Sequence, residues 1–403
     1  MIHPLPRRRS LTLLPGLLCL GLLSTPVQAE FDACVADLKN QALSAGVSES
    51  LVATVMSDMQ PRERILELDR SQPEFTASLA DYMGRRITEE RVQKGRELLE
   101  KHRDLLQGVT RESGVPPHYL VSFWGMETNF GSYFGRVPIP QALTTLACDQ
   151  RRSAYFTREL IAALTILDRG HIDPEAMKGS WAGAMGHMQF MPSVYLAHAV
   201  DADGDGRIDL WGSIPDAMTS AGHFLAHMGW QPEQRWGREV LLPEDFAYHR
   251  ASGRDDPKPL SHWRDLGVTD AFGNPLPRAD MEGSLLLPAG HEGPAFLVYD
   301  NFHVIMGWNR SEFYALSVGH LADRIAGAGP LQNPPPEHPP LSRDTLRALQ
   351  EQLNEKGFDA GKADGVMGPG TRSALQGYQR EQGLPADGYP DPRTLAALGL
   401  EAQ

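Results

Sequence analysis

Cysteine is scarce in this chain, and so are basic residues and long apolar runs. The 403 residues include three cysteines, and Asp and Glu outnumber Lys and Arg, so that the formal charge is −13. So few cysteines exclude a disulfide-rich miniprotein. The negative charge provides no basic field for a nucleic-acid backbone, and we expect no nucleic-acid partner. The one long apolar run lies near the N-terminus, which excludes a polytopic membrane protein.

The N-terminal 29 residues have the pattern of a secretory signal peptide. A basic segment, Arg7–Arg9, precedes the apolar run Leu11–Leu23, and Val27–Ala29 resembles a cleavage site. An uncleaved anchor is the alternative, but the apolar run is well short of the roughly 20 residues that a membrane-spanning helix needs. A leucine precedes Cys19 where a lipoprotein signal requires a small residue. We therefore predict a periplasmic protein without a lipid anchor or a transmembrane segment in its mature form.

A proline-rich segment divides the remaining chain. Residues 329–340 contain six prolines, which favour an extended, semi-rigid linker. It separates a large domain, residues 30–328, from a small domain, residues 341–403. Apolar residues in the large domain recur at intervals of three and four, so we expect mainly helices. Residues 234–294 form a loop-rich insert with short strands expected at 239–242 and 284–287.

Two cysteines remain after the signal peptide. Cys34 and Cys148 can form one disulfide in an exported protein. Two buried free thiols are the alternative, because spacing alone does not establish a bond.

A carboxylate lies on an apolar helix face in the segment that follows Pro116-Pro117. Leu120, Phe123, Trp124 and Glu127 fall at i, i+3, i+4 and i+7. A carboxylate beside large aromatic side chains is costly to ionise, so we expect its pKa to be raised. A protonated carboxyl group of this kind can act as a general acid in glycosidic cleavage. The alternative is a Glu at a helix end that turns to solvent or caps a neighbouring element.

Two further segments combine small, amide and aromatic residues. Residues 178–193 are rich in Gly and Ala and contain Gln189, whose amide can bind sugar hydroxyl or N-acetyl groups. Residues 301–314 contain Trp308, Asn309 and Tyr314, which can stack on sugar faces and form hydrogen bonds. Ordinary helix packing and core aromatics are the alternatives.

These motifs together resemble a known family. The segments Gly125–Gly131, Ala142–Leu146, Gly183–Gly186 and Gln189–Ser193 are similar to those of the membrane-bound lytic murein transglycosylase B family, glycoside hydrolase family 103. The similarity extends over most of residues 31–327. It implies a mainly α, lysozyme-like α+β catalytic domain that needs no cofactor for its chemistry.

The resemblance also implies roles for single residues. Glu127 matches the catalytic acid/base of the family. Five other residues match those that line its sugar cleft: Tyr82, Ser180, Gln189, Asn309 and Tyr314. The chain departs from the family pattern at His187-Met188, Phe224 and Trp308. In the implied reaction, one Glu cleaves the MurNAc-β-1,4-GlcNAc bond and leaves a 1,6-anhydroMurNAc end, without a second carboxylate and without net addition of water.

An Asp-rich segment has the spacing of a calcium loop. Asp201, Asp203 and Asp205 occupy positions 1, 3 and 5, and Arg207 offers a backbone carbonyl. Position 12 is Gly212 where a bidentate Glu is usual. The family resemblance suggests Asp216 as the closing ligand of a longer loop, with Asp209 as the other candidate. A structural Ca²⁺ is therefore one interpretation, and an Asp-rich turn without a metal is the other. His223 and His227 supply too few ligands to predict zinc.

The small domain resembles the peptidoglycan-binding domain type 1. Its apolar residues predict three amphipathic helices, with Asp364-Gly365 and Asp387-Gly388 as turns between them. The resemblance implies a three-helix domain that binds peptidoglycan glycan strands. Two functions follow for the whole chain: a wall-cleaving enzyme, which Glu127 and Gln189 favour, or a catalytically silent wall-binding scaffold. No sequence feature identifies a protein partner.

Overall fold

The computed structural model describes residues 26–70, 77–251 and 253–401. The basic segment and apolar run of the expected signal peptide lie outside these residues. Helix α1 begins at Pro26, so the expected cleavage site after Ala29 lies near its start. No helix in the described part of the chain is long and apolar enough to cross a membrane.

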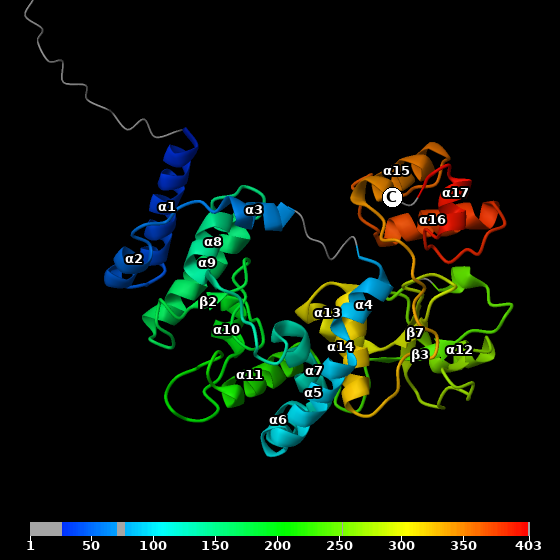
Figure 1. Cartoon of the computed structure of the whole chain (residues 1–403), viewed down its shortest axis with the longest axis horizontal. Coiled ribbons are helices and arrows are strands. Elements are labelled where there is room, and N and C mark those ends of the chain that lie inside the picture. The colour runs from blue at the N-terminus through cyan, green and yellow to red at the C-terminus, as the bar shows by residue number, and fades with distance from the viewer. Residues whose placement is uncertain (1–25, 71–76, 252, 402–403) are drawn as a thin grey trace, which may run out of the picture.

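The large domain is mainly helical, as expected from the spacing of its apolar residues. Its helices run in chain order from α1 to α11, followed by α13 and α14 (Figure 1). Their bounds are α1 Pro26–Ser44, α2 Glu49–Val55, α3 Glu63–Arg70, α4 Leu79–Arg86, α5 Glu89–Lys101, α6 Arg103–Ser113, α7 Pro117–Thr128, α8 Ile139–Ala147, α9 Ser153–Asp168, α10 Pro192–His198, α11 Ile214–His227, α13 Asp300–Trp308 and α14 Glu312–Ile325. Two short strands, β1 (Val137–Pro138) and β2 (Lys178–Gly179), pair antiparallel.

Helix α7 lies at the centre of this domain. It contacts α5, α6, α11 and α14, and most of its residues from Tyr119 to Gly125 are buried. A helix that is apolar on all sides is stable only inside a core. The proline pair that precedes it fixes its start, and Asn129 ends it in a left-handed conformation, with φ of 47°. The residue expected to be catalytic, Glu127, is therefore carried on a helix that packing fixes on several sides.

The insert and the residues that directly follow it form a five-stranded antiparallel sheet in the order β4-β6-β7-β3-β5, and α12 also belongs to the insert. The expected strands at 239–242 and 284–287 correspond to β3 (Gly237–Leu241) and β6 (Glu282–Leu286). The other elements are β4 (Lys258–Pro259), β5 (Thr269–Asp270), β7 (Ala295–Val298) and α12 (Leu260–Asp265). Alternate residues of β7 face opposite cores: Phe296 packs with the main core and Leu297 with a second core around Trp263. The sheet thus joins the insert to the large domain.

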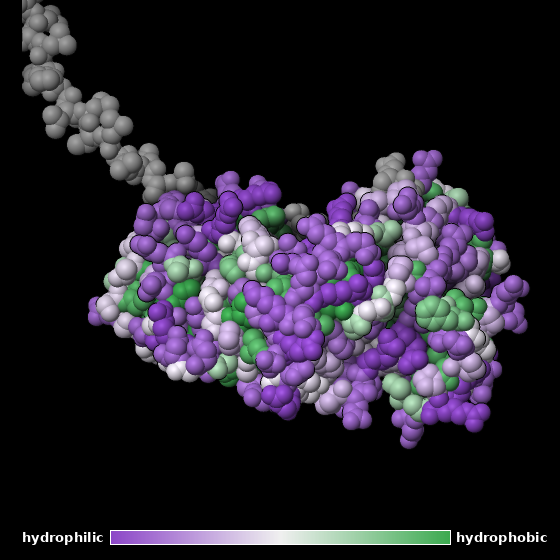
Figure 2. All heavy atoms as spheres, turned by 60° about the horizontal axis from the view of Figure 1, so that its bottom comes forward, coloured by the Kyte–Doolittle hydropathy of each residue, from purple (hydrophilic) through white to green (hydrophobic). Residues whose placement is uncertain are grey.

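The C-terminal domain consists of α15 (Arg343–Glu355), α16 (Pro369–Glu381) and α17 (Pro392–Ala397). Its core contains the residues expected from their spacing, including Leu349, Leu375 and Leu395. Figure 1 shows this domain beside the sheet and α12, at the opposite end of the molecule from α1 and α2. Figure 2 shows hydrophilic side chains over most of one face, with apolar side chains in scattered patches.

The proline-rich linker is held against the insert by hydrogen bonds. The carboxylate of Glu239 accepts hydrogen bonds from the backbone amides of Gln332 (2.9 Å) and Asn333 (2.7 Å). The Asn333 side chain donates to the Gly293 carbonyl at 2.7 Å. The proline-rich composition predicts an extended segment but does not indicate what that segment packs against. In the structure, Glu239 of the insert binds it.

The structure joins Cys34 to Cys148 in a disulfide that links residues 114 positions apart. The bond connects α1 to the end of α8, where Cys148 is the C-terminal cap. The alternative, a pair of buried free thiols, is therefore not found in the structure.

Removal of this disulfide should destabilise the large domain. A crosslink over a long loop reduces the entropy of the unfolded chain, and the Cys34→Ser/Cys148→Ser variant should lose roughly 3–5 kcal/mol of unfolding free energy. Denaturant titration followed by circular dichroism measures this loss. The wild-type protein under reducing conditions should behave in the same way, and an unchanged midpoint in both samples would contradict the prediction.

The structure also predicts loss of stability at mildly acidic pH. Burial lowers the pKa of His118, His187 and His320 from 6.5 to about 4. Between these values the unfolded chain binds protons that the folded chain does not, so the free energy of unfolding falls as the pH falls. The contribution is fully present above pH 6.5 and is lost toward pH 4. The melting temperature should fall over this range, and the fall should be smaller in His320→Gln. An equal pH dependence in both proteins would contradict this account.

Candidate active site

Glu127 lies in the last turn of α7 and is partly buried. The large side chains that precede it on this face, Phe123 and Trp124, are buried in the core. The carboxylate therefore lies where a rigid, apolar helix reaches the surface. The alternative in which this Glu turns away to solvent is not what the structure shows.

The Glu127 carboxylate is held by a buried tyrosine from another part of the chain. The Tyr314 hydroxyl donates a hydrogen bond to Glu127 Oε1. Burial, followed by the charge of Glu127, raises the pKa of Tyr314 well above its usual value of 10. The phenol is therefore neutral at any physiological pH and remains a hydrogen-bond donor to the carboxylate. Tyr314 lies in the first turn of α14, where its backbone amide donates to Ser311 Oγ, the N-cap.

Tyr82 lies beside this pair. It belongs to α4, is 3% exposed, and packs edge-on against Phe313, with ring centroids 5.9 Å apart. The guanidinium of Arg86 lies over its ring at 3.8 Å from the centroid, a cation–π arrangement. Tyr82 packs on the residue next to Tyr314 and is close enough to influence its pKa, although the two tyrosines lie more than 200 positions apart in the sequence.

The loop that carries Gln189 is attached to the same end of α7. Trp124 Nε1 donates to His187 Nδ1 at 2.9 Å, and the Thr128 hydroxyl donates to the His187 carbonyl at 2.9 Å. Because burial lowers the pKa of His187 to about 4, its ring is neutral and can accept this bond. His187 thereby fixes the loop next to the turn that carries Glu127.

Gln189 itself is held in an uncommon backbone conformation. Its φ is 48°, in the left-handed region that a non-glycine residue rarely adopts. Its side-chain amide donates to the carbonyls of Gly186 (3.0 Å) and Phe134 (3.3 Å). Such strain is retained where the surrounding structure fixes the residue, and it is frequent at binding sites.

Two other expected cleft residues organise their own segments. The Ser180 hydroxyl accepts hydrogen bonds from the backbone amides of Ala182 (3.3 Å) and Ala184 (3.0 Å). Asn309 is the C-cap of α13, and its side-chain carbonyl accepts from the Ser311 amide at 3.1 Å. Ser180 therefore shapes the loop that leads to Gln189, and Asn309 shapes the turn that leads to Tyr314.

Two of the positions at which the chain departs from the family pattern, Phe224 and Trp308, belong to one aromatic cluster. The Trp308 ring lies 5.3 Å from that of Phe224, 5.4 Å from that of Phe190 and 4.6 Å from that of Phe123. Phe224 and Trp308 thus pack together next to α7. Sequence reasoning treated each as a separate departure, and only the fold shows that the two are in contact.

The Asp-rich loop gathers three of its expected ligands. One carboxylate oxygen from each of Asp201, Asp203 and Asp205 can be chosen so that all lie within 4.8 Å of one another. Asp216, the suggested closing ligand, accepts from the amides of Ala202 and Asp209, each at 2.8 Å. Asp201 also accepts from backbone amides, those of Gly204 (2.7 Å) and Gly206 (2.8 Å). The oxygen donors of the three Asp residues are of the type that Ca²⁺ prefers.

This loop is also connected to the candidate site. The His187 amide donates to the Leu210 carbonyl at 2.8 Å. A side chain on Gly186, whose φ is 64°, would collide with the same carbonyl at 2.4 Å. The Asp-rich loop therefore supports the segment that carries Gln189.

Sequence reasoning missed the supporting residues. His187 and Phe313 contact their partners across long sequence separations, whereas Arg86 lies four residues after Tyr82 on the same helix α4. The only signal for His187 is its place between Gly186 and Gln189 in a motif already singled out. The contact of Phe313 with Tyr82 requires knowledge of the tertiary structure, whereas helical spacing alone could have indicated the contact of Arg86 with Tyr82.

Comparison with known proteins identifies both domains. Residues 30–323 match the model of the transglycosylase SLT domain, and residues 342–398 match that of the putative peptidoglycan binding domain. The chain is 33% identical over 246 residues to membrane-bound lytic murein transglycosylase B of Escherichia coli. These aligned residues cover 61% of this chain and 66% of that protein.

Solved structures give the same result. SltB3 of Pseudomonas aeruginosa, in complex with NAG-anhNAM-pentapeptide, is 42% identical with a TM-score of 0.88; the match covers 92% of this chain and 99% of that one. The E. coli lytic transglycosylase Slt35 in complex with calcium is 29% identical with a TM-score of 0.64, over 73% and 92% of the two chains. These neighbours confirm the expected mainly helical, lysozyme-like fold. The chain belongs to the transglycosylase SLT domain family, among the relatives of lytic murein transglycosylase B, and carries a C-terminal peptidoglycan-binding domain.

Proposed function

We propose that this protein is an exported lytic transglycosylase that cleaves peptidoglycan glycan strands with Glu127 as the single acid and base. The observation that carries the proposal is the hydrogen bond from the buried Tyr314 hydroxyl to the Glu127 carboxylate, in a domain of the transglycosylase family. The solved complex of SltB3 with a NAG-anhNAM-pentapeptide supports the expected product.

The reaction needs one proton, which leaves Glu127 and returns to it. Protonated Glu127 donates to the oxygen between MurNAc C1 and GlcNAc, and the C1–O bond breaks as positive charge develops at C1. The Glu127 carboxylate then accepts the proton of the C6 hydroxyl of the same MurNAc, and O6 bonds to C1. The product is a 1,6-anhydroMurNAc end, and no water is added or released. Hydrolytic glycosidases use a second carboxylate instead.

Tyr314 serves both states of the acid. Its neutral hydroxyl fixes the position of the carboxyl group, and a hydrogen bond to an ionised carboxylate contributes about 1.5–3 kcal/mol. Tyr82, Ser180, Gln189 and Asn309 would then line the sugar cleft around it. Tyr82 and Tyr314 are buried and would form the wall of the cleft behind Glu127, and the amides of Gln189 and Asn309 would offer donors and acceptors for N-acetyl groups.

Export and wall binding complete the proposal. The N-terminal 29 residues would direct the chain to the periplasm, where peptidoglycan lies. The C-terminal domain would bind the glycan network and raise the local concentration of the enzyme at an insoluble substrate. A silent wall-binding scaffold is the second function, and loss of products in every assay would favour it.

Calcium would have a structural role in this proposal. Asp201, Asp203 and Asp205 would bind the ion together with the Arg207 carbonyl, with Asp209 or Asp216 completing the set only if the loop rearranges. Neutralising three clustered carboxylates would stabilise the loop that supports His187. The calcium complex of Slt35 supports the choice of ion.

The first test replaces the proposed acid. Glu127→Gln should retain the fold and glycan binding but lose turnover by at least a hundred-fold, because an amide neither donates nor accepts the catalytic proton. Mass spectrometry of muropeptide digests measures the products, which should be lighter by one water molecule than those of hydrolysis. Glu175→Gln, which changes an exposed carboxylate elsewhere, is the matched control. Wild-type turnover by Glu127→Gln would refute the mechanism, and hydrated ends would indicate a hydrolase.

The second test addresses the metal. Chelation with EDTA should lower the melting temperature by several degrees, because an ion that binds only the folded chain stabilises it by mass action. Added Ca²⁺ should restore the original value. Asp203→Asn should remove this response, whereas Asp104→Asn, an exposed carboxylate on α6, should retain it. A melting temperature that neither EDTA nor Ca²⁺ changes would identify the loop as an Asp-rich turn without a metal.

A further inference from the structure

One carboxylate of the large domain, Glu312, forms an ion pair with the C-terminal domain. Glu312 Oε1 is paired with Arg254 of the insert at 2.5 Å, and Glu312 Oε2 with Arg372 of α16 at 3.3 Å. The three side chains are 18–29% exposed, so solvent screens these pairs less than it would on an open surface. Glu312 is thus shared by the insert and the C-terminal domain.

Glu312 also belongs to the turn that holds the proposed acid. It is the first residue of α14. The next residue, Phe313, packs on Tyr82, and the one after it, Tyr314, donates to Glu127. Three consecutive residues therefore contact the C-terminal domain, the cleft and the acid, so a shift of Glu312 displaces the other two.

This turn is short and firmly built. The Ser311 hydroxyl accepts from the Tyr314 amide at 3.3 Å, and Asn309 accepts from the Ser311 amide at 3.1 Å. An N-capped first turn moves as a unit, because its backbone donors are tied to the cap. Arg372 is thus connected to Glu127 through its ion pair with Glu312, the first turn of α14, and the hydrogen bond from Tyr314.

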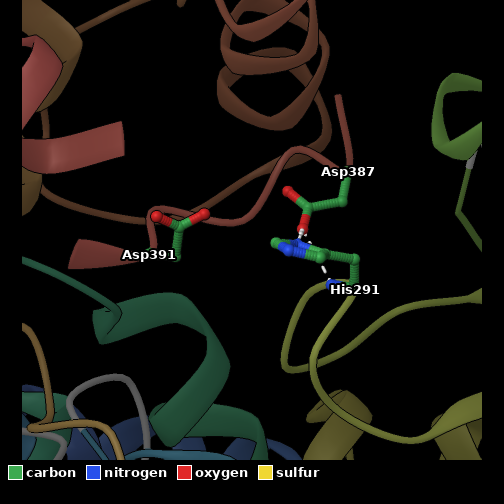
Figure 3. Close-up of side chains that lie close together, drawn as sticks. All are labelled: His291, Asp387 and Asp391. Atoms are coloured by element: carbon green, nitrogen blue, oxygen red, sulfur yellow. Dashed lines mark hydrogen bonds and ion pairs between the residues drawn. The ribbon is translucent and has the colours of Figure 1, made fainter. Parts of the chain in front are cut away.

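A second contact fixes the C-terminal domain in place. Figure 3 shows His291, on a loop of the insert, with its ring directed at Asp387 of the C-terminal domain. The ring nitrogen lies 2.6 Å from Asp387 Oδ2, and the His291 amide donates to the same oxygen at 2.8 Å. Asp391 is engaged in its own helix cap, accepting from the Arg393 and Thr394 amides. The pair of His291 and Asp387 is therefore an interdomain contact, and Asp391 serves its own helix.

A cavity of about 620 Å³ lies between the two domains at this point, lined by Glu312, Arg254 and Arg372 among others. Within it, Glu312 pairs with both Arg254 and Arg372. Because of this cavity, the ion pairs are not surrounded by closely packed side chains. The mechanical link between α16 and α14 therefore depends on Glu312 and Arg372.

We propose that the C-terminal domain positions the catalytic acid as well as binding the wall, with Arg372 acting as a positioning residue through Glu312, Tyr314 and Glu127. This inference rests on the proposed function. An anchor acts only on an insoluble substrate, whereas a positioning residue acts on every substrate. The two roles therefore differ on a small soluble glycan, which needs no anchor.

The test uses the full-length chain and a soluble, uncrosslinked peptidoglycan oligosaccharide. Arg372→Ala should lower kcat roughly three- to ten-fold and leave KM nearly unchanged, because a misplaced acid slows the chemical step more than binding. Arg372→Lys keeps the charge and should recover much of the rate. Glu312→Gln should reproduce the loss, and the decreases of Arg372→Ala and Tyr314→Phe should not add fully when combined, because both act on one contact.

Arg380→Ala is the matched control, because it removes the same charge from the exposed side of the same helix. It should have the wild-type kcat. An Arg372→Ala protein with wild-type kcat on the soluble glycan and a lower rate on intact sacculi would overturn the proposal and leave the domain an anchor alone. Equal losses in Arg372→Ala and Arg380→Ala would also overturn it. Glu127→Gln distinguishes failure of this inference from failure of the proposed function. If Glu127→Gln is inactive while Arg372→Ala has the wild-type kcat, Arg372 does not position the acid, and the proposed function stands.

Discussion

The hydrogen bond between Tyr314 and Glu127 is the contact on which the arrangement of the large domain depends. It joins residues 187 positions apart, and it can form only if α7 and α14 pack closely. A second buried bond joins the same helices, from the Ser122 hydroxyl to the Val318 carbonyl at 2.7 Å. Buried polar groups without partners are costly, so these bonds select one register between two otherwise apolar helices. The core thereby aligns the proposed acid with its donor.

Local patterns in the sequence predict the elements well and their partners poorly. The spacing of Leu120, Phe123 and Trp124 predicts the helix that carries Glu127, and the three helices of the C-terminal domain follow from the same periodicity. Strand β7, at residues 295–298, was missed because it is buried on both faces and shows no alternation of polar and apolar residues. Motif matching placed Tyr82 and Tyr314 in the cleft, but their contacts with Phe313 and Glu127 depend on the fold.

The Asp-rich loop shows the same limit for a metal ligand. The spacing of Asp201, Asp203 and Asp205 brings their carboxylates together as expected. Asp216 fits the same pattern in sequence, yet its oxygens cap the backbone of the loop. The buried Asp216 carboxylate satisfies amide groups of the loop that would otherwise lack partners, and this local demand competes with metal binding. Spacing alone does not decide between the two uses.

The insert explains why the two domains form one unit. Its residues Arg254, His291 and Glu239 bind Glu312, Asp387 and the linker, respectively. The contacts that hold the C-terminal domain are therefore made by the insert or lie next to it. A flexible spacer would let a wall-binding domain search a wide volume, but it would give no fixed geometry between the bound strand and the cleft. A docked linker has the opposite effects: it limits the volume that the wall-binding domain can search, and it fixes the orientation of that domain relative to the cleft. A rigid connection is useful only if the wall-binding surface and Glu127 must act on the glycan in a defined relation, and it is also what allows an arginine of one domain to support the acid of the other.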